Sequence, residues 1–495
     1  MKGLIKFLSP FAPDQSGASG VLYGLGGLIV ICDAGGCTGN ICGFDEPRWF
    51  LRNQESKKTP SSIKDSAVEE EKPKSLCLSS EVSAQSPVEN EFLPNRSTPG
   101  IILSAGLRDM DAILGRDDQL IEKLKDAAEK LGSPFAALIG TPVPAVIGTD
   151  FPALRRMAER KCHLPVLGIP CTGTGLYDEG EEAAYLALFE RFAKTPSEKL
   201  PEDTPASKIT DISREKTAAS DAEEKLLSCP ALLGGENTPA SAHKDALGSS
   251  SVVKGRLGIL GATPLNLSTA KPFERLVEAL GTDNLLCYGT SGGLSAVELA
   301  GTAEKNLVVA PSGLAAAKKL EAQFGTPYEV TYPLLPDTFP TIDRCSSNIN
   351  TVPAKDGASE NHLFGDPETL EAVHKASESV SPENDPSANS APASFHGTHA
   401  LIVHQQVLAN EARKRLLAAG CESVTVATFF NLEKELAGPG DLHLSEESEL
   451  KDLLESGKYD LVAADRYLAR CARNYNGRWI HLPHFAVSGE CADLA

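Results

Sequence analysis

The feature that most constrains the fold of this chain is a repeated alternation between short apolar runs and helical segments. The runs are rich in Val, Ile and Leu and end in Gly, Ser or Thr, as in GIILSAG at 100–106 and RLGILGAT at 256–263. The segment 271–281 that follows has the three- and four-residue apolar spacing of one helix face. Strands alternating with helices of this length indicate βαβ units, parallel sheets and right-handed crossovers. We therefore expect an α/β fold with three Rossmann-like lobes, mainly parallel sheets and a central crevice at the strand ends.

Three stretches break the pattern, at about 54–98, 196–251 and 340–394. They mix charged residues with Ser and Pro and have no apolar periodicity. Such segments bury too little apolar surface to offset the entropy of ordering the backbone, about 1–2 kcal/mol per residue. We expect all three to be disordered insertions. The predicted lobes are then residues 1–195 (with the first insertion inside), 252–339 and 395–495.

The overall charge excludes some classes of function. The 495 residues include 47 Lys and Arg against 67 Asp and Glu, which gives a net charge of −20. Contacts to nucleic-acid phosphates need a basic surface, so no nucleic-acid partner is expected. No apolar run reaches the roughly 18–20 residues of a membrane helix, and the amino-terminal apolar stretch is too short for a signal peptide. We expect a cytoplasmic protein without a membrane partner.

Cysteine is the residue type that most directly suggests chemistry. In a cytoplasmic chain, twelve cysteines favour metal ligands, buried apolar side chains or redox thiols over a disulfide framework. Cys32, Cys37 and Cys42 lie in a Gly-rich loop directly after an apolar strand. Thiolates are the ligands of iron–sulfur clusters, and glycines let backbone N–H groups approach the sulfide. The five-residue step matches no common ferredoxin or zinc spacing, so a buried Cys32 at a strand end is an open alternative.

Cys171 lies at another predicted strand end, in the sequence GIPCTGTG. Both a metal ligand and a buried thiol are consistent with this position. The loop 172–175 that follows offers backbone N–H groups that would suit an anion. The sequence therefore predicts either a second ligand-bearing loop or a small anion site here.

Several of these segments resemble one known family, the nitrogenase component 1 proteins. The stretch 16–40 is similar to the family's first cysteine loop, where a Gly-rich helix and a strand lead to a cluster-ligating cysteine, and that cysteine corresponds to Cys37. Residues 137–150 resemble its second cluster loop, 288–330 the Gly-rich part of its middle lobe, and 482–489 its last cofactor-facing segment. The resemblance covers nearly all of the chain outside the three insertions.

This chain differs from the family at four ligand positions. Pro13 and Asp14 stand where the upstream cluster cysteine is expected, and Thr141 stands where the second loop has a cysteine. Ala310 takes the place of the cofactor cysteine, and Pro483 that of the cofactor histidine. The resemblance therefore implies an iron–sulfur cluster, with [4Fe–4S] expected, but no iron–molybdenum cofactor and no reduction of dinitrogen.

A [4Fe–4S] cluster needs four ligands, so one retained family cysteine is too few within a single chain. A second component 1 subunit, identical or paralogous, would complete the set, and Asp14 is a further candidate oxygen ligand. If the family fold holds, His481 and His484 face the central crevice as proton donors, cofactor ligands or hydrogen-bonded interface residues. The candidate metal ligands are Cys37, Cys42, Cys32 and Cys171.

The resemblance implies the catalytic component of a nitrogenase-like, two-component reductase. An iron-protein-type, ATP-dependent reductase would deliver low-potential electrons through the cluster to a small-molecule substrate that the sequence does not identify. This chain has neither a GxGxxG nor a Walker motif, so ATP would be hydrolysed by the partner. One alternative is a non-catalytic scaffold or carrier for assembly of a metallocluster or tetrapyrrole cofactor. Another is a cluster-free binding module that has kept only the three-lobed fold.

Overall fold

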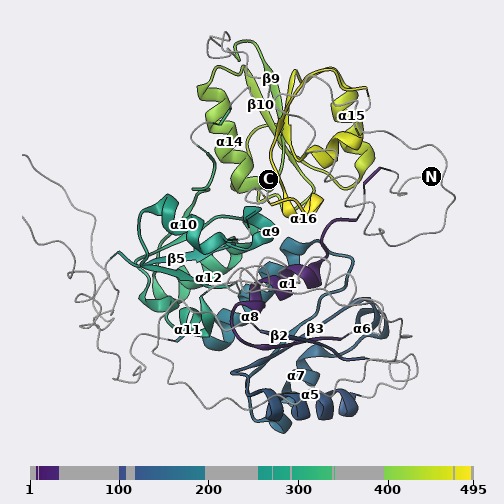
Figure 1. The fold of residues 1–495 in the computed structure, drawn as a ribbon, viewed down its shortest axis with the longest axis vertical. Helices are drawn as coiled ribbons and strands as arrows, with labels where there is room; N and C mark the ends of the chain where they lie inside the picture. The colour runs from purple at the N-terminus through teal and green to yellow at the C-terminus, as the bar shows by residue number, and fades with distance from the viewer. Residues whose placement is uncertain are drawn as a thin grey trace, which may run out of the picture.

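In the computed structural model the chain forms three separate sheets, each made of parallel strands and flanked by helices (Figure 1). This confirms the predicted α/β architecture. Apart from Pro340, the three predicted insertions lie outside the described residues. None of the helices in the described ranges is both long and apolar enough to cross a membrane. The structure describes residues 7–8, 10–32, 100–106, 117–194, 255–269, 271–289, 292–336, 339–340, 395–471 and 474–491.

The first sheet has the strand order β2-β1-β3-β4. The central strands β1 and β3 are apolar and fully buried because helices cover both faces of the sheet. Leu28 and Val30 pack toward α5 and α7, whereas Ile29 and Ile31 pack toward α1 and α8. The elements are α1 (Asp14–Tyr23), β1 (Leu28–Ile31), β2 (Ile101–Ser104), α5 (Asp117–Leu131), β3 (Ala136–Ile139), α6 (Pro142–Ile147), α7 (Phe151–Cys162), β4 (Val166–Ile169) and α8 (Tyr177–Phe192).

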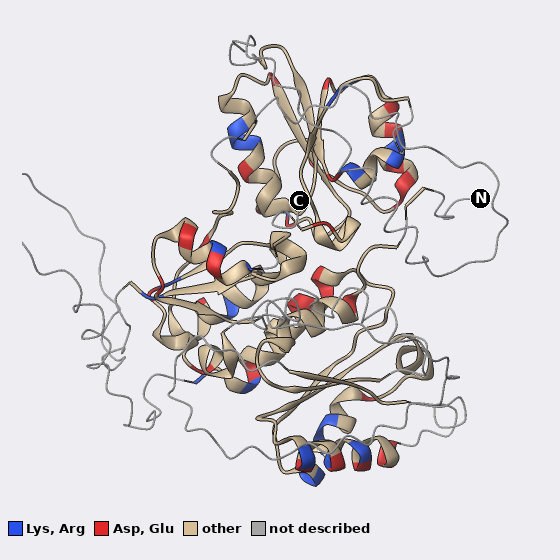
Figure 2. Ribbon diagram, in the orientation of Figure 1, with Lys and Arg blue, Asp and Glu red and all other residues tan. Residues whose placement is uncertain are grey.

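Helix α5 shows why the amphipathic pattern predicted this arrangement. Its buried side is apolar and packs on the sheet, and its solvent side carries mixed charges (Figure 2). Two ion pairs with i,i+4 spacing, Lys125 with Glu129 and Lys130 with Asp126, lie on that solvent side. Such exposed pairs contribute only about 0.3–0.5 kcal/mol each, so burial of the apolar side holds the helix in place.

The second sheet repeats the same order, β6-β5-β7-β8. Helix α12 covers one side of it together with α8, so the first and second lobes share one continuous apolar core. The elements are β5 (Leu257–Leu260), α9 (Pro264–Leu267), α10 (Pro272–Leu280), β6 (Leu285–Cys287), α11 (Gly293–Glu298), η1 (Ala300–Thr302), β7 (Lys305–Val308), η2 (Pro311–Gly313), α12 (Leu314–Phe324) and β8 (Tyr328–Val330).

The third sheet has five strands in the order β11-β10-β9-β12-β13. It lies at the far end of the molecule from α5 and α7 (Figure 1). The elements are β9 (His399–Val403), α14 (Gln406–Ala418), β10 (Ser423–Thr428), β11 (Leu442–His443), α15 (Glu447–Glu455), β12 (Leu461–Ala464), η4 (Arg466–Cys471), β13 (Arg478–His481) and α16 (Phe485–Ser488).

Helix α8 connects the lobes at the centre of the molecule. It crosses α1 so closely that a Cβ atom at Gly17 would lie 1.7 Å from the carbonyl oxygen of Tyr177. Further along the helix, the Tyr185 hydroxyl accepts the N–H of Gly261, which follows β5, at 3.1 Å. Its first residue, Tyr177, donates its N–H to Ala12 at 3.0 Å, and the Ala12 N–H bonds Ala486 of the third lobe at 3.1 Å. All three lobes are therefore joined around the beginning of α8.

Each sheet contains one point at which the strand order reverses. These switch points lie between β1 and β3, between β5 and β7, and between β9 and β12. In open parallel sheets, ligands bind outside the carboxyl ends of the strands at such points. The residues that follow these six strands are therefore the first place to look for a functional site.

Candidate functional site

At the first switch point, the chain leaves β1 through Cys32 and leaves β3 through Gly140 and Thr141. The buried Thr141 hydroxyl donates to the Cys32 carbonyl oxygen at 2.7 Å, and the Cys32 N–H donates to Ile139 at 2.9 Å. Cys32 is only 2% exposed. Thr141, which stands where the sequence resemblance led us to expect a cysteine, thus ties the two strand ends together.

The Cys171 loop packs directly on the same edge of the sheet. Cys171 follows β4 and is 5% exposed. A Cβ atom at Gly140 would lie 2.3 Å from the Cys171 carbonyl oxygen, so only glycine permits this approach. Gly173 has a positive φ of 72°, and a Cβ atom there would meet Pro142 at 2.5 Å. The loops after β1, β3 and β4 therefore converge at one place, which we call the cluster edge (Cys32, Gly140–Pro142 and Cys171–Gly173).

Asp14, the first residue of α1, closes the cluster edge from the other side. Its buried carboxylate accepts the N–H groups of Thr172 at 2.7 Å, Gly173 at 2.9 Å and Gln15 at 2.8 Å. It also accepts the Thr172 hydroxyl at 3.2 Å. The anion that the 172–175 loop binds in this structure is therefore the chain's own carboxylate. Because these bonds use both carboxylate oxygens, the geometry argues against Asp14 as a cluster ligand.

The described residues do not by themselves form a metal centre. Across the ranges that the structure describes, no three His, Cys, Asp or Glu side chains are grouped so that they could hold a metal ion. Cys37 and Cys42 lie outside the described residues, and Cys32 and Cys171 are both placed at the cluster edge. The assignment of these four cysteines as ligands stays a prediction.

The second and third switch points face each other at the centre of the molecule. Gly261 follows β5 with a φ of 82°, and a Cβ atom there would lie 2.9 Å from the Cβ of Ala310, which follows β7. Gln405, which follows β9, donates its side-chain amide to the Val309 carbonyl oxygen at 3.1 Å. We call this region the junction; it is formed by the carboxyl ends of the second and third sheets and the beginning of α8.

Glu181 of α8 is the acidic group of the junction. Its carboxyl group is fully buried and accepts the Thr263 hydroxyl at 2.5 Å, the Asn266 amide at 2.6 Å and the Ser312 hydroxyl at 2.6 Å. Burial raises the pKa of Glu181 to about 8, and nearby Asp178 adds to the rise, while the three hydrogen bonds oppose it. Glu181 is therefore mostly protonated at neutral pH.

A chain of hydrogen bonds continues from Asn266 into the third lobe. The Tyr177 hydroxyl donates to the Asn266 side-chain oxygen at 2.8 Å and lies 3.2 Å from Nε2 of His484. Because the hydroxyl proton is used on Asn266, Nε2 of His484 must be the donor in the second contact. His484, predicted from sequence to face the central crevice, thus lies at the junction and contacts both other lobes.

The two histidines of the junction, His404 and His484, are neutral because both rings are buried. The rings of His404 and His484 lie 4.3 Å apart and are almost completely buried. Burial lowers the pKa of His404 to about 4 and that of His484 well below its usual value. Nδ1 of His404 accepts the Gln405 N–H at 2.9 Å, so its Nε2 carries the proton and donates to Pro483 at 3.1 Å.

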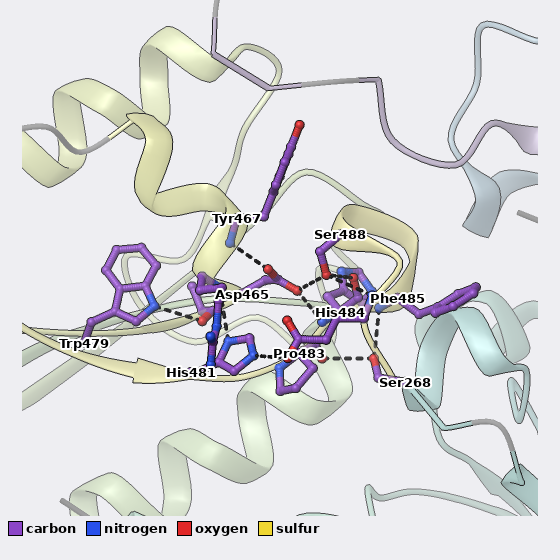
Figure 3. Close-up of polar contacts among 12 residues, drawn as sticks. Ser268, Asp465, Tyr467, Trp479, His481, Pro483, His484, Phe485 and Ser488 are labelled. Atoms are coloured by element: carbon purple, nitrogen blue, oxygen red, sulfur yellow. Dashed lines mark hydrogen bonds and ion pairs between the residues drawn. The ribbon is translucent and has the colours of Figure 1, made fainter. Parts of the chain in front are cut away.

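Asp465, the first residue after β12, fixes the His484 segment (Figure 3). One carboxylate oxygen accepts the His484 N–H at 2.8 Å and the Ser488 hydroxyl at 2.6 Å. From the second lobe, the Ser268 hydroxyl donates to Pro483 at 2.9 Å. Pro483, which stands where the sequence resemblance led us to expect a cofactor histidine, is thus part of the contact between the second and third lobes.

His481 has different partners from His484. Its Nδ1 accepts the Arg466 N–H at 3.1 Å, and its Nε2 lies 3.0 Å from the Glu490 carboxylate. The hydrogen bond and the charge of His481 lower the pKa of Glu490. Both ring nitrogens of His481 are therefore engaged within the third lobe, and its predicted role as proton donor or ligand stays a prediction.

Sequence reasoning missed several junction residues. His404 and Asp465 each follow a predicted strand directly, and so the switch-point rule identifies them once the strand order is known. Glu181 and Asn266 carry no such signal, because an acidic residue in GEEAAY is typical of a solvent-exposed helix face.

The junction does not fit an iron–molybdenum type cofactor. Tyr177, Glu181, Asn266 and His484 fill it with side chains that are at most 1% exposed and hydrogen-bonded to one another. Ala310 offers no thiolate at the position where the family's cofactor cysteine is expected. We therefore derive no step that passes through such a cofactor.

Comparison with known proteins agrees with the resemblance noted in the sequence. The family model of nitrogenase component 1 type oxidoreductases matches residues 88–485. A solved structure of nitrogenase Cp1 at pH 6.5 shares the fold, with a TM-score of 0.52 and 10% identity over 97% of this chain and 87% of that chain. A second structure, nitrogenase Cp1 at pH 5, has a TM-score of 0.43 and 13% identity over 99% of this chain and 78% of that chain. No curated protein matches the sequence.

Proposed function

The chain belongs to the nitrogenase component 1 type oxidoreductase family, and from this premise we propose that it is the catalytic component of a two-component reductase. An ATP-dependent reductase of the iron-protein type supplies single low-potential electrons. A small molecule other than dinitrogen accepts them, because the junction lacks the ligands of the nitrogenase cofactor. Electrons enter through an iron–sulfur cluster held at the cluster edge.

The observation that carries this proposal is the convergence of three loops at the cluster edge. Cys32 and Cys171 lie there, and Thr141 bonds the Cys32 backbone. Cys37 follows Cys32 by five residues, and five residues of extended chain span at most about 18 Å. The Cys37 thiolate is therefore within reach of this edge, where ligands bind in parallel sheets.

The bound cluster, expected to be [4Fe–4S], supplies one-electron transfer at low potential. The chain's own residues prepare the site. Asp14 holds the Thr172–Gly173 backbone against α1 and so keeps Cys171 at the edge. Burial of Cys32 and Cys171 keeps water away from the thiols, which is one of the factors that tune the potential of a cluster.

A second component 1 subunit, identical or paralogous, completes the ligand set in this proposal. The described residues place two thiols at the cluster edge, whereas a [4Fe–4S] cluster takes four ligands. Only Cys37 corresponds to a family cluster cysteine, and Cys42, Cys32 and Cys171 are further candidates, so a facing subunit contributes the ligands that this chain does not supply. Sedimentation of the anaerobic protein is expected to show a dimer or a complex with a paralogue, and a cluster-loaded monomer would contradict this part.

Electron delivery is the direct test of the proposed function. The cluster-loaded chain is mixed anaerobically with a reduced iron-protein-type partner, with MgATP or a non-hydrolysable ATP analogue. We expect bleaching of the cluster absorbance with MgATP and none with the analogue. Absence of reduction under both conditions, with the partner active toward its own acceptor, would contradict the proposal.

A second candidate function is a scaffold or carrier on which a metallocluster or tetrapyrrole cofactor is assembled. The closed junction favours it, because Tyr177, Glu181 and His484 occupy the place where a reductase would hold its substrate. The number of turnovers per chain distinguishes a reductase from a carrier. A reductase oxidises many equivalents of the reduced partner per chain when substrate is added, whereas a carrier accepts about one equivalent and stops.

A further inference from the structure

The Glu181 carboxyl group is the polar centre of the contact between α8 and the second lobe. Its three partners, Thr263, Asn266 and Ser312, all belong to the second lobe. Thr263 and Asn266 lie in the segment after β5, and Ser312 lies in η2 after β7. One side chain therefore holds α8 to both sides of the second switch point. We call these four residues the Glu181 cluster.

No positive charge balances this carboxyl group. Among the residues that the structure describes, no Lys, Arg or charged His is a partner of Glu181. The ionisable groups that interact electrostatically with it are acidic or neutral: Asp178, Tyr177 and Tyr185. The neighbouring Glu182 interacts with Glu433 and Lys318 instead. The basic residues near α8 are paired with other carboxylates. These pairs are Lys318 with Glu435, Lys319 with Glu190, Arg191 with Glu159 and Lys194 with Glu298.

The partners suit a neutral acid. The Thr263 hydroxyl, which lies 2.5 Å from Oε1 of Glu181, can accept a hydrogen bond as well as donate one, so a protonated Glu181 can donate from Oε1 to Thr263. The Asn266 amide and the Ser312 hydroxyl then still donate to the other carboxyl oxygen, Oε2, each at 2.6 Å. An ionised Glu181 would instead be a fully buried anion without a counter-charge, which is costly in a protein interior.

The Glu181 cluster also extends to the third lobe. Asn266 accepts the Tyr177 hydroxyl at 2.8 Å, and that hydroxyl contacts His484 at 3.2 Å. A change in the position of Asn266 therefore alters contacts in all three lobes at once.

We propose that a proton on Glu181 holds the three lobes closed around α8, and that its loss at mildly alkaline pH loosens the second lobe from α8. Water entering between α8 and the loops after β5 and β7 solvates the anion that forms. The junction, closed in this structure, then becomes accessible from solvent. This pH-dependent opening is independent of the cluster edge and of the proposed electron transfer.

The direction of the pH dependence follows from linkage. The pKa of Glu181 in the closed form is raised to about 8 from its usual 4.5, so the closed form holds more protons than the open form between these values. The equilibrium constant for closure therefore falls as pH rises, by up to about ten-fold per pH unit, and becomes constant above pH 8. His404 and His484, whose pKa values are lowered, act in the opposite direction, but only below about pH 6.5. Burial raises the pKa of Asp178 to about 6, below this range, so Glu181 is the described junction group expected to change protonation between pH 6.5 and 8.

Hydrogen–deuterium exchange of the full-length chain tests the proposal. Protection is measured at several pH values from 6.5 to 8.5 in peptides covering 257–268, 308–316 and 478–489, and is corrected for the intrinsic rise of exchange with pH. We expect wild-type protection to fall up to about ten-fold per pH unit until pH 8. In Glu181→Gln, which keeps the size and the hydrogen bonds but cannot ionise, protection is expected to be independent of pH.

Glu190→Gln is the matched control, because Glu190 lies on the same helix but is exposed and paired with Lys319. It is expected to behave as the wild type. A Glu181→Gln protein with the wild-type pH dependence would overturn the proposal. The wild-type chain gives a second, independent answer: constant protection across the window would overturn it whether or not the variant folds.

Discussion

At the scale of single residues, the clearest lesson comes from Asp14. It stands near a family ligand position, yet its carboxylate is bonded by three backbone N–H groups and one hydroxyl. Hydrogen bonds to a charged acceptor are worth about 1.5–3 kcal/mol each, and removing the acceptor leaves the donors without partners. Asp14 thus organises the cluster edge without being a ligand.

We predict that Asp14→Ala lowers the free energy of unfolding by about 2 kcal/mol and speeds alkylation of Cys171. The physical reason is that the Thr172–Gly173 backbone loses its acceptor and the loop moves away from α1. Urea unfolding and peptide-level mass spectrometry after iodoacetamide treatment measure the two effects. Asp14→Asn, which keeps an acceptor oxygen, is expected to have the smaller effect; equal alkylation rates in all three proteins would contradict this.

The lowered pKa of His404 predicts that the folded chain loses stability in acid. Its pKa in the folded chain is lowered to about 4 from 6.5, so between these values the unfolded chain binds more protons. Stability from this residue is complete above pH 6.5 and falls as pH decreases, by about ten-fold in the folding equilibrium constant per pH unit. We expect His404→Gln to reduce this loss in urea unfolding at pH 5 against pH 7. An unchanged difference between the two pH values would rule out His404 as its source.

At the scale of elements, α1 and α8 show how glycine sets a helix contact. A Cβ atom at Gly17 would lie 1.7 Å from the Tyr177 carbonyl oxygen, and one at Gly180 would lie 1.7 Å from that of Asp14. Both atoms belong to backbone, which cannot move aside as a flexible side chain can. The position of α8, and with it Tyr177 and Glu181, therefore depends on these two glycines.

Gly17→Ala is expected to destabilise the chain by about 3 kcal/mol, because the helices must separate to accommodate the new methyl group. Gly20→Ala on the same helix is the matched control. Its Cβ atom would have its nearest neighbour, Leu265, at 4.0 Å, so a gain of about 0.5–1 kcal/mol is expected from helix propensity. Thermal or urea unfolding distinguishes them, and a similar loss in both variants would contradict the close crossing.

The strands could be predicted from sequence, whereas α8 could not. Runs such as 28–31 and 136–139 are apolar because both faces of the sheet are covered, and that pattern is visible in the sequence. Helix α8 is buried on several sides, between two sheets and against the third lobe, so it lacks a single apolar stripe. Its acidic residues Asp178 and Glu181 resemble a solvated face in the sequence, and only the assembled fold shows that they are buried.

At the scale of the whole molecule, the three sheets place their switch points in two different locations. The first lies at the cluster edge with Cys32, and the second and third meet at the junction with Ala310 and His404. The sequence predicted a cysteine loop after the first apolar strand, and Cys37 in that loop lies outside the described residues, so its place at the cluster edge stays a prediction. The family resemblance implied the loss of the cofactor ligands, but the sequence did not predict the hydrogen-bonded side chains that fill the junction. That difference arises because packing between lobes depends on contacts between residues far apart in the chain.

The central claim is that Cys37 anchors an iron–sulfur cluster at the cluster edge. The most direct measurement is iron and acid-labile sulfide content, with the electron paramagnetic resonance spectrum, of anaerobically purified protein. The account predicts a [4Fe–4S] signal in the wild type, its loss in Cys37→Ala, and its retention in Cys162→Ala, a control in α7 whose thiol pKa is raised by burial. Unchanged iron, sulfide and signal in Cys37→Ala would contradict it.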